Sequence, residues 1–164
     1  MNQANATLVD RGYQAVYRSA FWALRAWWFL TRPDQHGALV LVRDANDRVL
    51  LIRNSYQPLW SVPGGTVNRG EQPGEAAARE LREEMGVSVK ADQLIRVAAI
   101  TLPFRFRRDH VDLFEWRPAS LPTFTIDHRE VVEMRWFDVA EARTLRAIPH
   151  LQQHFAELRH GMDG

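Results

Sequence analysis

The sequence predicts a single domain of the α+β or α/β class, preceded by a helix at the N-terminus. Short apolar segments bounded by turn residues, typical of strands, lie on both sides of a central helical segment. That segment carries a proline at its expected start and a glycine after its expected end. The chain has 164 residues, of which 46% are apolar, enough for one well-buried domain and short for two.

The composition narrows the class of protein. The formal net charge is +1, so the chain lacks the basic excess that nucleic-acid binding requires, and no specific nucleic-acid partner is expected. Cysteine is absent, which excludes a disulfide framework and a thiolate metal site. This composition is compatible with the reducing cytosol, and we expect a cytoplasmic protein.

The first predicted element is a helix over residues 8–30. From Ala20 to Leu30 its single charged residue is Arg25, which has aromatic residues on both sides. Exposed apolar surface of this kind is unfavourable in water. We therefore expect this segment to pack either on the chain's own domain or on a second copy across a homodimer interface. Contact of this segment with a membrane surface is the less favoured alternative. A membrane span is not expected, because a span needs about 20 apolar residues.

Pro33 disfavours helix at the residue before it, so the chain divides into an N-terminal helix with its linker (residues 1–35) and a main domain (residues 36–164). The main domain opens with two apolar segments, 37–43 and 48–53. Turn residues separate them, and we interpret them as the strands of a hairpin. A further strand follows that contains Trp60, whose indole is expected in the core.

A helix is expected from Pro73 to Met85. Pro73 suits the first helical turn, where its missing N–H is not needed, and Glu75 complements the positive end of the helix dipole. Gly86 can adopt the left-handed conformation that ends a helix. Both boundaries therefore follow from local signals.

Three carboxylates, those of Glu80, Glu83 and Glu84, fall on one face of this helix at i, i+3 and i+4. Like charges so spaced destabilise a helix by roughly 0.2–0.5 kcal/mol per pair, and a cation relieves the repulsion. Oxygen ligands without His or Cys suit Mg²⁺ or Mn²⁺ and do not favour zinc. Before the helix, Gly64 and Gly65 predict a tight turn whose backbone can approach a ligand.

The segment from Gly65 to Val87 resembles the Nudix box, G-x5-E-x7-R-E-U-x-E-E-x-G-U, in which U is an apolar residue. Every position of that pattern is matched, by Gly65, Glu71, Arg79, Glu80, Leu81, Glu83, Glu84, Gly86 and Val87. The chain is therefore similar to the Nudix (MutT-like) hydrolases. The resemblance implies the Nudix fold over residues 36–164, a mixed β-sheet sandwiched between helices, to which this chain adds an N-terminal helix rich in aromatic residues and arginine.

The resemblance also implies a reaction, the Mg²⁺- or Mn²⁺-dependent cleavage of a diphosphate (P–O–P) bond in a nucleoside diphosphate linked to another moiety. Carried over by position, Glu83, Glu84 and the carbonyl of Gly64 bind the metal. Glu80 is implied as a further ligand or as the base that deprotonates the attacking water. The expected partner is thus a small nucleoside diphosphate derivative.

The remaining box positions receive structural roles: Gly65, Glu71, Arg79 and Gly86. An ion pair between Glu71 and Arg79 would hold the loop to the helix. Many Nudix enzymes use a glutamate outside the box as another ligand or as the general base. Glu130, just before a strand predicted over residues 131–137, is the best-placed candidate for that role, and Glu133 is the next.

Two further strands are predicted after the box, and the segment between them is a candidate for substrate recognition. Strand alternation would send Phe104 and Phe106 to one face and Arg105 and Arg107 to the other. Arginine forks match phosphate oxygens and aromatic faces stack on bases, so these four residues are predicted to bind substrate. An ordinary solvated hairpin tip is the alternative.

The rest of the chain is expected to support the site. Residues 117–129 contain two prolines and no clear period, which predicts a mobile loop able to close over the site. A helix is expected from Asp138 to about Ala147, and a last helix follows Pro149.

The substrate stays open at this stage. Pro103 lies sixteen residues past Val87, close to where the ADP-ribose branch of the Nudix family often carries a proline. ADP-ribose and nucleotide sugars are therefore candidates, beside oxidised nucleoside triphosphates and dinucleoside polyphosphates. A diphosphatase acting on a lipid-linked diphosphate is an alternative that the aromatic helix permits. A non-catalytic nucleotide-binding regulatory module is another, disfavoured by the complete glutamate set.

Overall fold

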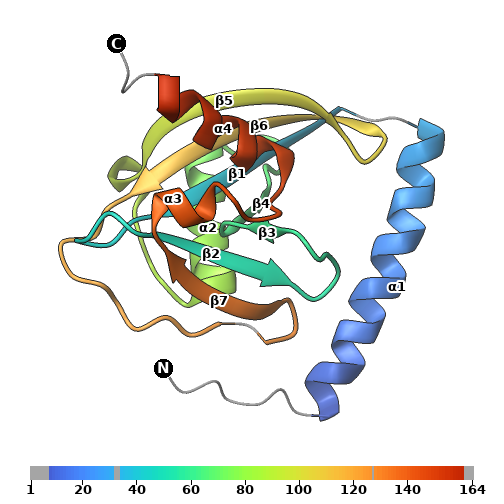
Figure 1. Ribbon diagram of the computed structural model, residues 1–164. Helices are drawn as coiled ribbons and strands as arrows, with labels where there is room; N and C mark the ends of the chain where they lie inside the picture. Colours follow the sequence, from blue (N-terminus) through green and yellow to red (C-terminus); the bar gives the residue numbers. More distant parts are fainter. Residues whose placement is uncertain (1–7, 32–33, 127, 161–164) are drawn as a thin grey trace.

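The computed structural model describes residues 8–31, 34–126 and 128–160 (Figure 1). Its elements are α1 (Leu8–Thr31), β1 (Asp34–Val42), β2 (Val49–Asn54), β3 (Trp60–Ser61), β4 (Gly64–Thr66), α2 (Pro73–Met85), the 3₁₀ helix η1 (Ala91–Gln93), β5 (Ile95–Phe104), β6 (Arg107–Trp116), β7 (Val131–Phe137), α3 (Val139–Ala142) and α4 (Pro149–His160).

The strands form two sheets. The first has the order β4-β1-β6-β5, in which β1 and β6 run parallel and the other neighbours run antiparallel. The second has the order β3-β2-β7 and is antiparallel. Helix α2 packs against β1 and β4, and α4 packs against β5. The predicted class, a mixed sheet flanked by helices with an added N-terminal helix, is confirmed, although the strands are shared between two sheets.

Side chains of β1 alternate between two buried cores. Val40 packs with Leu81 of α2 in one core, whereas Leu41 packs with Phe155 of α4 in the other. Successive side chains of a strand point to opposite faces, so a strand buried on both faces is apolar throughout. The strand β1 therefore separates α2 from α4 and holds each helix in a fixed place.

The prediction that the first two strands of the main domain pair as a hairpin is wrong. Both strands are present, but β1 and β2 meet at a single antiparallel bridge, Arg43↔Val49, and then enter different sheets. The reason is that β1 is already paired with β4 along one edge and with β6 along the other. On the edge away from β6, β4 takes Gly37, Ala38 and Leu39, and the N–H of Val40 donates to the carbonyl of Pro63 at 2.8 Å, so only the last residues of β1 remain for β2.

The helix predicted after β7 is shorter than expected and ends at Ala142. The following residues run beside β3 instead. The backbone N–H of Trp60 donates to the carbonyl of Arg146 at 3.0 Å, and that of Ile148 donates to the carbonyl of Trp60 at 2.9 Å. The Trp60 ring is partly buried in the core and meets Phe137 edge to face at a centroid distance of 5.0 Å, as predicted.

The turn between β5 and β6 differs from the predicted alternation. Arg105 and Phe106 form it, and both have positive φ, 53° and 69° respectively. Phe104 and Arg107 are opposite each other across the two strands. Two left-handed residues match the twist of the flanking strands, but they interrupt the alternation of side chains between the two faces of the strand. The prediction that Phe104 and Phe106 share one face is therefore wrong.

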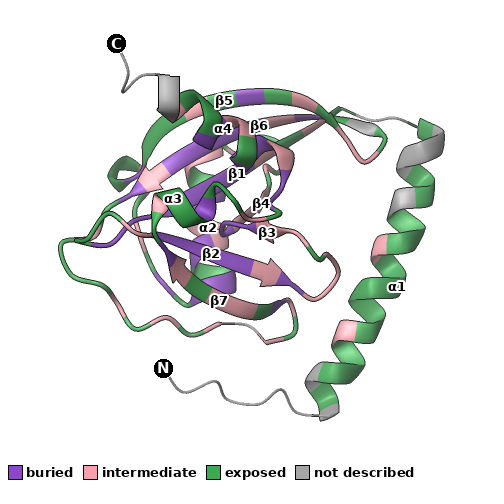
Figure 2. Cartoon of the chain, viewed as in Figure 1, coloured by how far each residue is buried: buried purple, intermediate pink, exposed green. Residues whose placement is uncertain are grey.

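Helix α1 lies along one side of the main domain and is largely exposed (Figures 1 and 2). Val9, Val16 and Trp27 are 64%, 65% and 61% exposed. Gln14 and Phe21 are the described side chains of α1 with intermediate exposure. Packing on the chain's own domain thus covers part of the apolar surface. Among the residues placed in the structure, no helix has the length and hydropathy needed to cross a membrane.

Candidate active site

Helix α2 carries the candidate ligands, and local interactions fix both of its ends. Pro73 begins the helix, and the backbone N–H of Gln72 donates to the carboxylate of Glu75 at 3.1 Å. Gly86, at φ 67°, ends the helix, and its N–H donates to the carbonyl of Arg82 at 3.1 Å. The predicted helix and its left-handed glycine cap are confirmed.

The buried face of α2 includes one of the acidic residues. Ala77, Leu81 and Met85 are fully buried, and residues three or four apart share a face of a helix. Glu84 falls within this face and is 4% exposed. Glu83 lies at the edge, where its side chain is 52% exposed. The carboxylates of α2 therefore range from buried to solvated.

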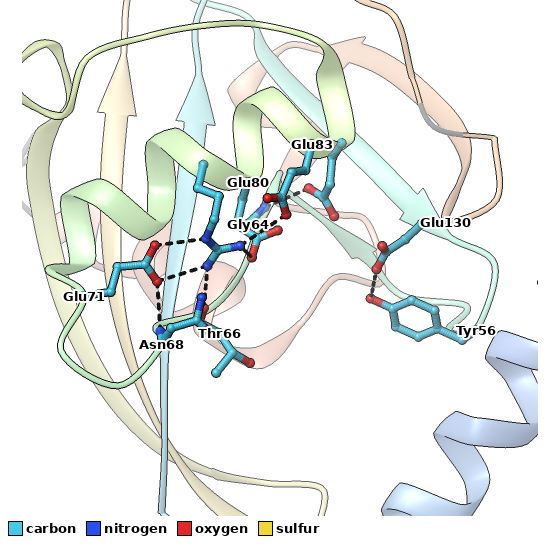
Figure 3. A network of polar contacts seen from close by, with 10 residues as sticks. Tyr56, Gly64, Thr66, Asn68, Glu71, Glu80, Glu83 and Glu130 are labelled. Carbon is cyan, nitrogen blue, oxygen red and sulfur yellow. Dashed lines mark hydrogen bonds and ion pairs between the residues drawn. The ribbon is translucent and has the colours of Figure 1, made fainter.

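Arg79 connects the loop before α2 with the acidic side of the helix, and Figure 3 labels its partners Glu71, Thr66, Glu80 and Glu83. Its Nε and Nη2 donate to Glu71 at 2.9 and 3.1 Å, and Nη2 also donates to the carbonyl of Thr66 at 2.9 Å. Its Nη1 donates to Glu80 at 2.6 Å and to Glu83 at 3.2 Å. The hydrogen bonds from Arg79 lower the pKa of Glu71. The ion pair that the resemblance implies is thus present.

The carboxylate of Glu84 lies at the start of β4. Its Oε2 accepts a hydrogen bond from the N–H of Gly64 at 2.9 Å. Burial raises the pKa of Glu84 well above its usual range, and the charge of Glu130 raises it further. Gly64 has φ 144°, and a Cβ at this position would lie 2.2 Å from the carbonyl oxygen of Ala38. A glycine is required here, because any side chain would collide with β1.

Gly65 makes room for the next carboxylate. A Cβ on Gly65 would lie 2.5 Å from Oε1 of Glu80, so this carboxylate packs directly against the bare backbone of β4. Burial raises the pKa of Glu80, whereas the hydrogen bond and charge of Arg79 act in the opposite direction. The predicted turn at these glycines is in fact the short strand β4, paired with β1.

Glu130 reaches the site from the loop before β7. Its Oε1 accepts a hydrogen bond from the hydroxyl of Tyr56 at 2.9 Å, and Nδ2 of Asn54 donates to the same hydroxyl at 2.8 Å. Burial, followed by the charge of Glu130, raises the pKa of Tyr56, so its hydroxyl stays a neutral donor. The charge of Glu130 also raises the pKa values of Glu84 and Glu80. These three carboxylates therefore lie within electrostatic reach of one another.

Tyr56 is a site residue that the sequence does not identify. It lies in a loop, and its one signal is an aromatic ring among polar neighbours. Glu133, the second candidate outside the box, instead forms an ion pair with Arg53 at 2.5 Å. The predicted mobile loop is anchored near its end, because the N–H of Thr125 donates to the carbonyl of Met85 at 2.9 Å.

The carboxylates offer a donor set composed of oxygen atoms, which fits a hard divalent cation such as Mg²⁺ or Mn²⁺. A cation would also relieve the repulsion between desolvated like charges. Within the described ranges, no three His, Asp or Glu side chains have the arrangement of a formed metal site. The reason is that Arg79 holds Glu80 and Glu83, while Gly64 holds Glu84. Metal binding would exchange some of these contacts.

A cleft of about 310 Å³ opens beside β4. Its lining includes Phe21 of α1, Tyr56 of the β2–β3 loop, and Phe104 and Arg105 of the β5–β6 hairpin. Two of the four residues predicted to bind substrate are therefore at the cleft. Phe106 is 49% exposed at the tip of the hairpin and does not line this cleft.

The side chain of Arg107, the fourth predicted substrate-binding residue, lies outside the described part of the chain. The cleft runs from the backbone of Gly64 and Gly65 in β4 to Phe21 and Leu24 of α1, and the glutamates of α2 do not line it. Its walls combine aromatic rings with an arginine, a combination suited to a ligand that carries both a ring and phosphate groups.

Comparison with known sequences identifies the family. The family model described as NUDIX domain matches residues 33–158. The MutT-like protein of Streptomyces ambofaciens is 30% identical over 138 residues, which are 76% of this chain and 87% of that protein. A putative 8-oxo-dGTP diphosphatase of Bacillus subtilis (strain 168) is 41% identical over 61 residues, 37% of this chain and 41% of that protein. This second match thus spans less than half of the Bacillus protein.

Solved structures share the fold at low sequence identity. The MutT protein from Methanosarcina mazei Go1 has a TM-score of 0.68 and 20% identity, covering 80% of this chain and 96% of that one. A bifunctional NMN adenylyltransferase/ADP ribose pyrophosphatase from Francisella tularensis, complexed with AMP and a Mn ion, has a TM-score of 0.64 and 21% identity, covering 89% of this chain and 48% of that one. Since the family model covers most of the chain, the protein belongs to the Nudix family.

Proposed function

We propose that this enzyme hydrolyses the P–O–P linkage of a nucleoside diphosphate joined to a second moiety, with Mg²⁺ or Mn²⁺ as cofactor. The supporting observation is the grouping of carboxylates around the backbone of Gly64. Glu80, Glu83 and Glu84 come from α2, and Glu130 comes from a segment distant in the sequence. Such a grouping of like charges against Gly64 and Gly65, two residues that line the cleft, suits a cation that is shared with a phosphate group.

We assign the ligand role to Glu83, Glu84 and the carbonyl of Gly64, with Glu80 as a further ligand. A divalent ion bound there would neutralise charge on the diphosphate and lower the pKa of a bound water molecule. The bonds from Arg79 to Glu80 and Glu83 keep these carboxylates close to β4. Arg79 thus acts as a positioning residue in this proposal.

Glu130 is the proposed general base, with Glu80 as the alternative. The neutral hydroxyl of Tyr56 orients Glu130, whereas Glu80 is paired with the cationic group of Arg79. A base is most effective when its pKa lies near the working pH. We expect Glu130→Gln to lose the acidic limb of the pH–rate profile and Glu80→Gln to retain it. The reverse result would assign the base to Glu80.

The test of the ligand assignment is Glu84→Gln, which keeps the side-chain shape and an acceptor for the N–H of Gly64. We expect the Mg²⁺-dependent kcat to fall by at least about 100-fold. Glu157→Gln, an exposed change on α4, is the control and should keep wild-type kcat. Circular dichroism would verify the fold of both variants. Full activity in Glu84→Gln would refute the assignment.

ADP-ribose or a nucleotide sugar is the proposed substrate class. The rings of Tyr56 and Phe104 suit a flat heterocycle, and Arg105 suits a phosphate oxygen. The name of the Francisella protein supports ADP-ribose, and that of the Bacillus protein makes an oxidised nucleoside triphosphate the second candidate. The substrate would be identified by assaying a panel of ADP-ribose, UDP-glucose, 8-oxo-dGTP and a prenyl diphosphate. The measurement is the release of nucleoside monophosphate and phosphate. Tight nucleotide binding without any turnover would favour the non-catalytic module.

The homodimer and the cytoplasmic location stay predictions. The exposed Val16 and Trp27 on α1 favour a second copy as the cover for this helix. Light scattering on the full chain would give the mass. The double variant Val16→Glu, Trp27→Glu should then convert a dimer into a monomer, whereas a monomeric wild-type protein would rule the dimer out.

A further inference from the structure

Among the described side chains of α1, several that meet the main domain lie in one stripe of the helix surface. Gln14, Phe21 and Leu24 lie seven and three residues apart, which places them on the same side of a helix. Near the start of α1, Nε2 of Gln14 donates to the carbonyl of His128 at 2.9 Å. The centroid of the ring of Tyr13, the residue before Gln14, lies 4.6 Å from the guanidinium group of Arg129 in the same loop. Two turns further on, Phe21 and Leu24 reach the cleft.

The contacts of Phe21 are with residues that already line the cleft. Its ring lies 5.1 Å from that of Tyr56 and 4.7 Å from the guanidinium of Arg105, measured from the ring centroid. The same guanidinium lies 4.6 Å from the centroid of the Phe104 ring. An arginine between two aromatic faces is held in place by cation–π contacts. Phe21, Arg105 and Phe104 therefore form one continuous wall.

Described side chains of α1 contact two segments of the main domain, the loop before β7 and the β5–β6 hairpin. His128 belongs to the loop that leads into Glu130, and Arg105 is at the tip of the β5–β6 hairpin. Figure 1 shows α1 passing from the β7 side of the domain to this hairpin. The helix thus bridges two segments that are about twenty residues apart in sequence, and its residues Phe21 and Leu24 line the same cleft as β4.

A buried polar group in the same cleft points to the kind of ligand. Asn54 is 6% exposed, and its Nδ2 donates to the hydroxyl of Tyr56. Its Oδ1 is buried and has no hydrogen-bond partner among the described residues. Buried acceptors are nearly always paired, so a donor from a bound molecule would complete this group. A planar ring that carries an N–H donor, as a nucleobase does, fits both this acceptor and the aromatic wall.

We propose that α1 is a wall of the substrate cleft and that Phe21 is a specificity-determining residue for the ring-bearing moiety of the substrate. This inference rests on the proposed function for the identity of the substrate. The carboxylates act on the diphosphate at β4, while Phe21 and Asn54 bind the ring at a distance from the reacting bond. Phe21 should therefore govern substrate binding more than turnover.

The test compares Phe21→Ala with Trp22→Ala, since the neighbouring Trp22 is 66% exposed and does not line the cleft. With the best nucleotide substrate, we expect Phe21→Ala to raise KM about 10-fold and to change kcat less than about 2-fold, as loss of a stacking contact does. Phe21→Trp should restore much of the binding, and Trp22→Ala should match the wild type. An equal KM for the two alanine variants, or a loss confined to kcat, would overturn the proposal.

A binding measurement separates this inference from the proposed reaction. The affinities for AMP and for ribose 5-phosphate, which lacks the base, are measured by calorimetry on the same full-length variants. We expect Phe21→Ala to weaken AMP binding about 10-fold and to leave ribose 5-phosphate binding unchanged. If no substrate is turned over but this difference is found, the reaction is wrong and the wall is supported. If turnover is found without this difference, the wall is wrong.

Discussion

The segment from Gly64 to Gly86 and the helix α1 are built in opposite ways. In the former, Arg79 bonds to groups on both the loop and the helix, and a buried helix face carries Glu84. In α1 most described side chains are exposed, and Gln14 and Phe21, which contact the main domain, lie in one stripe. The first region is held by many local contacts, whereas the second is held by a few distant ones.

This difference separates the two tasks that we assign to the site. The groups assigned to chemistry lie within one short segment, so their positions depend on local spacing and on helix geometry. The groups assigned to recognition come from α1, the β2–β3 loop and the β5–β6 hairpin, and meet in the folded protein. Substitutions in the two regions should therefore have effects of different size on stability.

The largest expected effect is that of Arg79→Lys. Lysine keeps the charge but lacks the planar fork, so the bonds to Glu71, Thr66 and Glu80 cannot all be retained. We expect the free energy of unfolding, measured with urea, to fall by about 2–4 kcal/mol. Arg82→Lys, an exposed change on the same helix, should stay within about 0.5 kcal/mol of the wild type. Equal losses in the two variants would contradict the central role of Arg79.

The next effect concerns Glu84 and depends on pH. Burial raises its pKa in the folded protein, so the folded state binds more protons than the unfolded state as the pH rises from the unfolded value of about 4.3 to the raised folded value. The stability of the metal-free protein therefore falls across that window. Glu84→Gln removes this dependence. We expect its Tm to exceed that of the wild type by roughly 3–6 °C at about pH 8, and to equal it near pH 4.

Metal addition provides the control for that prediction. Mg²⁺ or Mn²⁺ should raise the Tm of the wild type at about pH 8, because a ligand that binds the folded state stabilises it. The same addition should leave Glu84→Gln nearly unchanged. A Tm difference between wild type and variant that is the same at both pH values would show that the buried charge is not its cause.

A smaller effect is expected for Gly86→Ala. The left-handed conformation at φ 67° is unfavourable for alanine, and a Cβ would lie 3.1 Å from the Cβ of Thr125. We expect the free energy of unfolding to fall by about 1–2 kcal/mol. Gly70→Ala is the matched control, because Gly70 has φ 82° and open space around it. A larger loss in Gly70→Ala would mean that contact with Thr125 does not contribute.

The smallest effect is expected in α1. Gly12 has no atom within 4 Å of the place where a Cβ would be, so Gly12→Ala creates no collision. Alanine favours the helix by about 1 kcal/mol locally, which far-ultraviolet circular dichroism would detect. Because α1 has few contacts with the main domain, the Tm of that domain should change by less than about 1 °C. A rise of several degrees would show that α1 and the main domain unfold together.

The sequence predicts the box region well for a physical reason. Helix α2 begins at Pro73 and is capped by Gly86 as expected, since both signals act within a few residues. The pairing of β1 could not be predicted in the same way. Its partner β6 is about seventy residues away, and no local pattern reveals that both edges of β1 are taken.

The recognition side of the site was the least predictable. Turns with two left-handed residues usually contain Asn or Gly, and this chain has Arg105 and Phe106 instead. Tyr56 depends on tertiary structure for its place beside Glu130, because a register shift between Arg53 and Asn54 ends the regular pairing of β2 just before it. Neither the alternation of apolar and polar residues nor the strand propensity of the sequence predicts such a shift.

The bridging position of α1 has a consequence for how this protein can diversify. The residues of α1 that line the cleft lie on a helix whose remaining described surface is mostly solvated, so substitutions there disturb little else. With the roles that we propose for α1 and α2, new substrates would be acquired in evolution by altering residues 8–31 while the acidic residues of α2 are inherited unchanged. Descendants of one ancestral gene would then diverge in what they bind before they diverge in which bond they break.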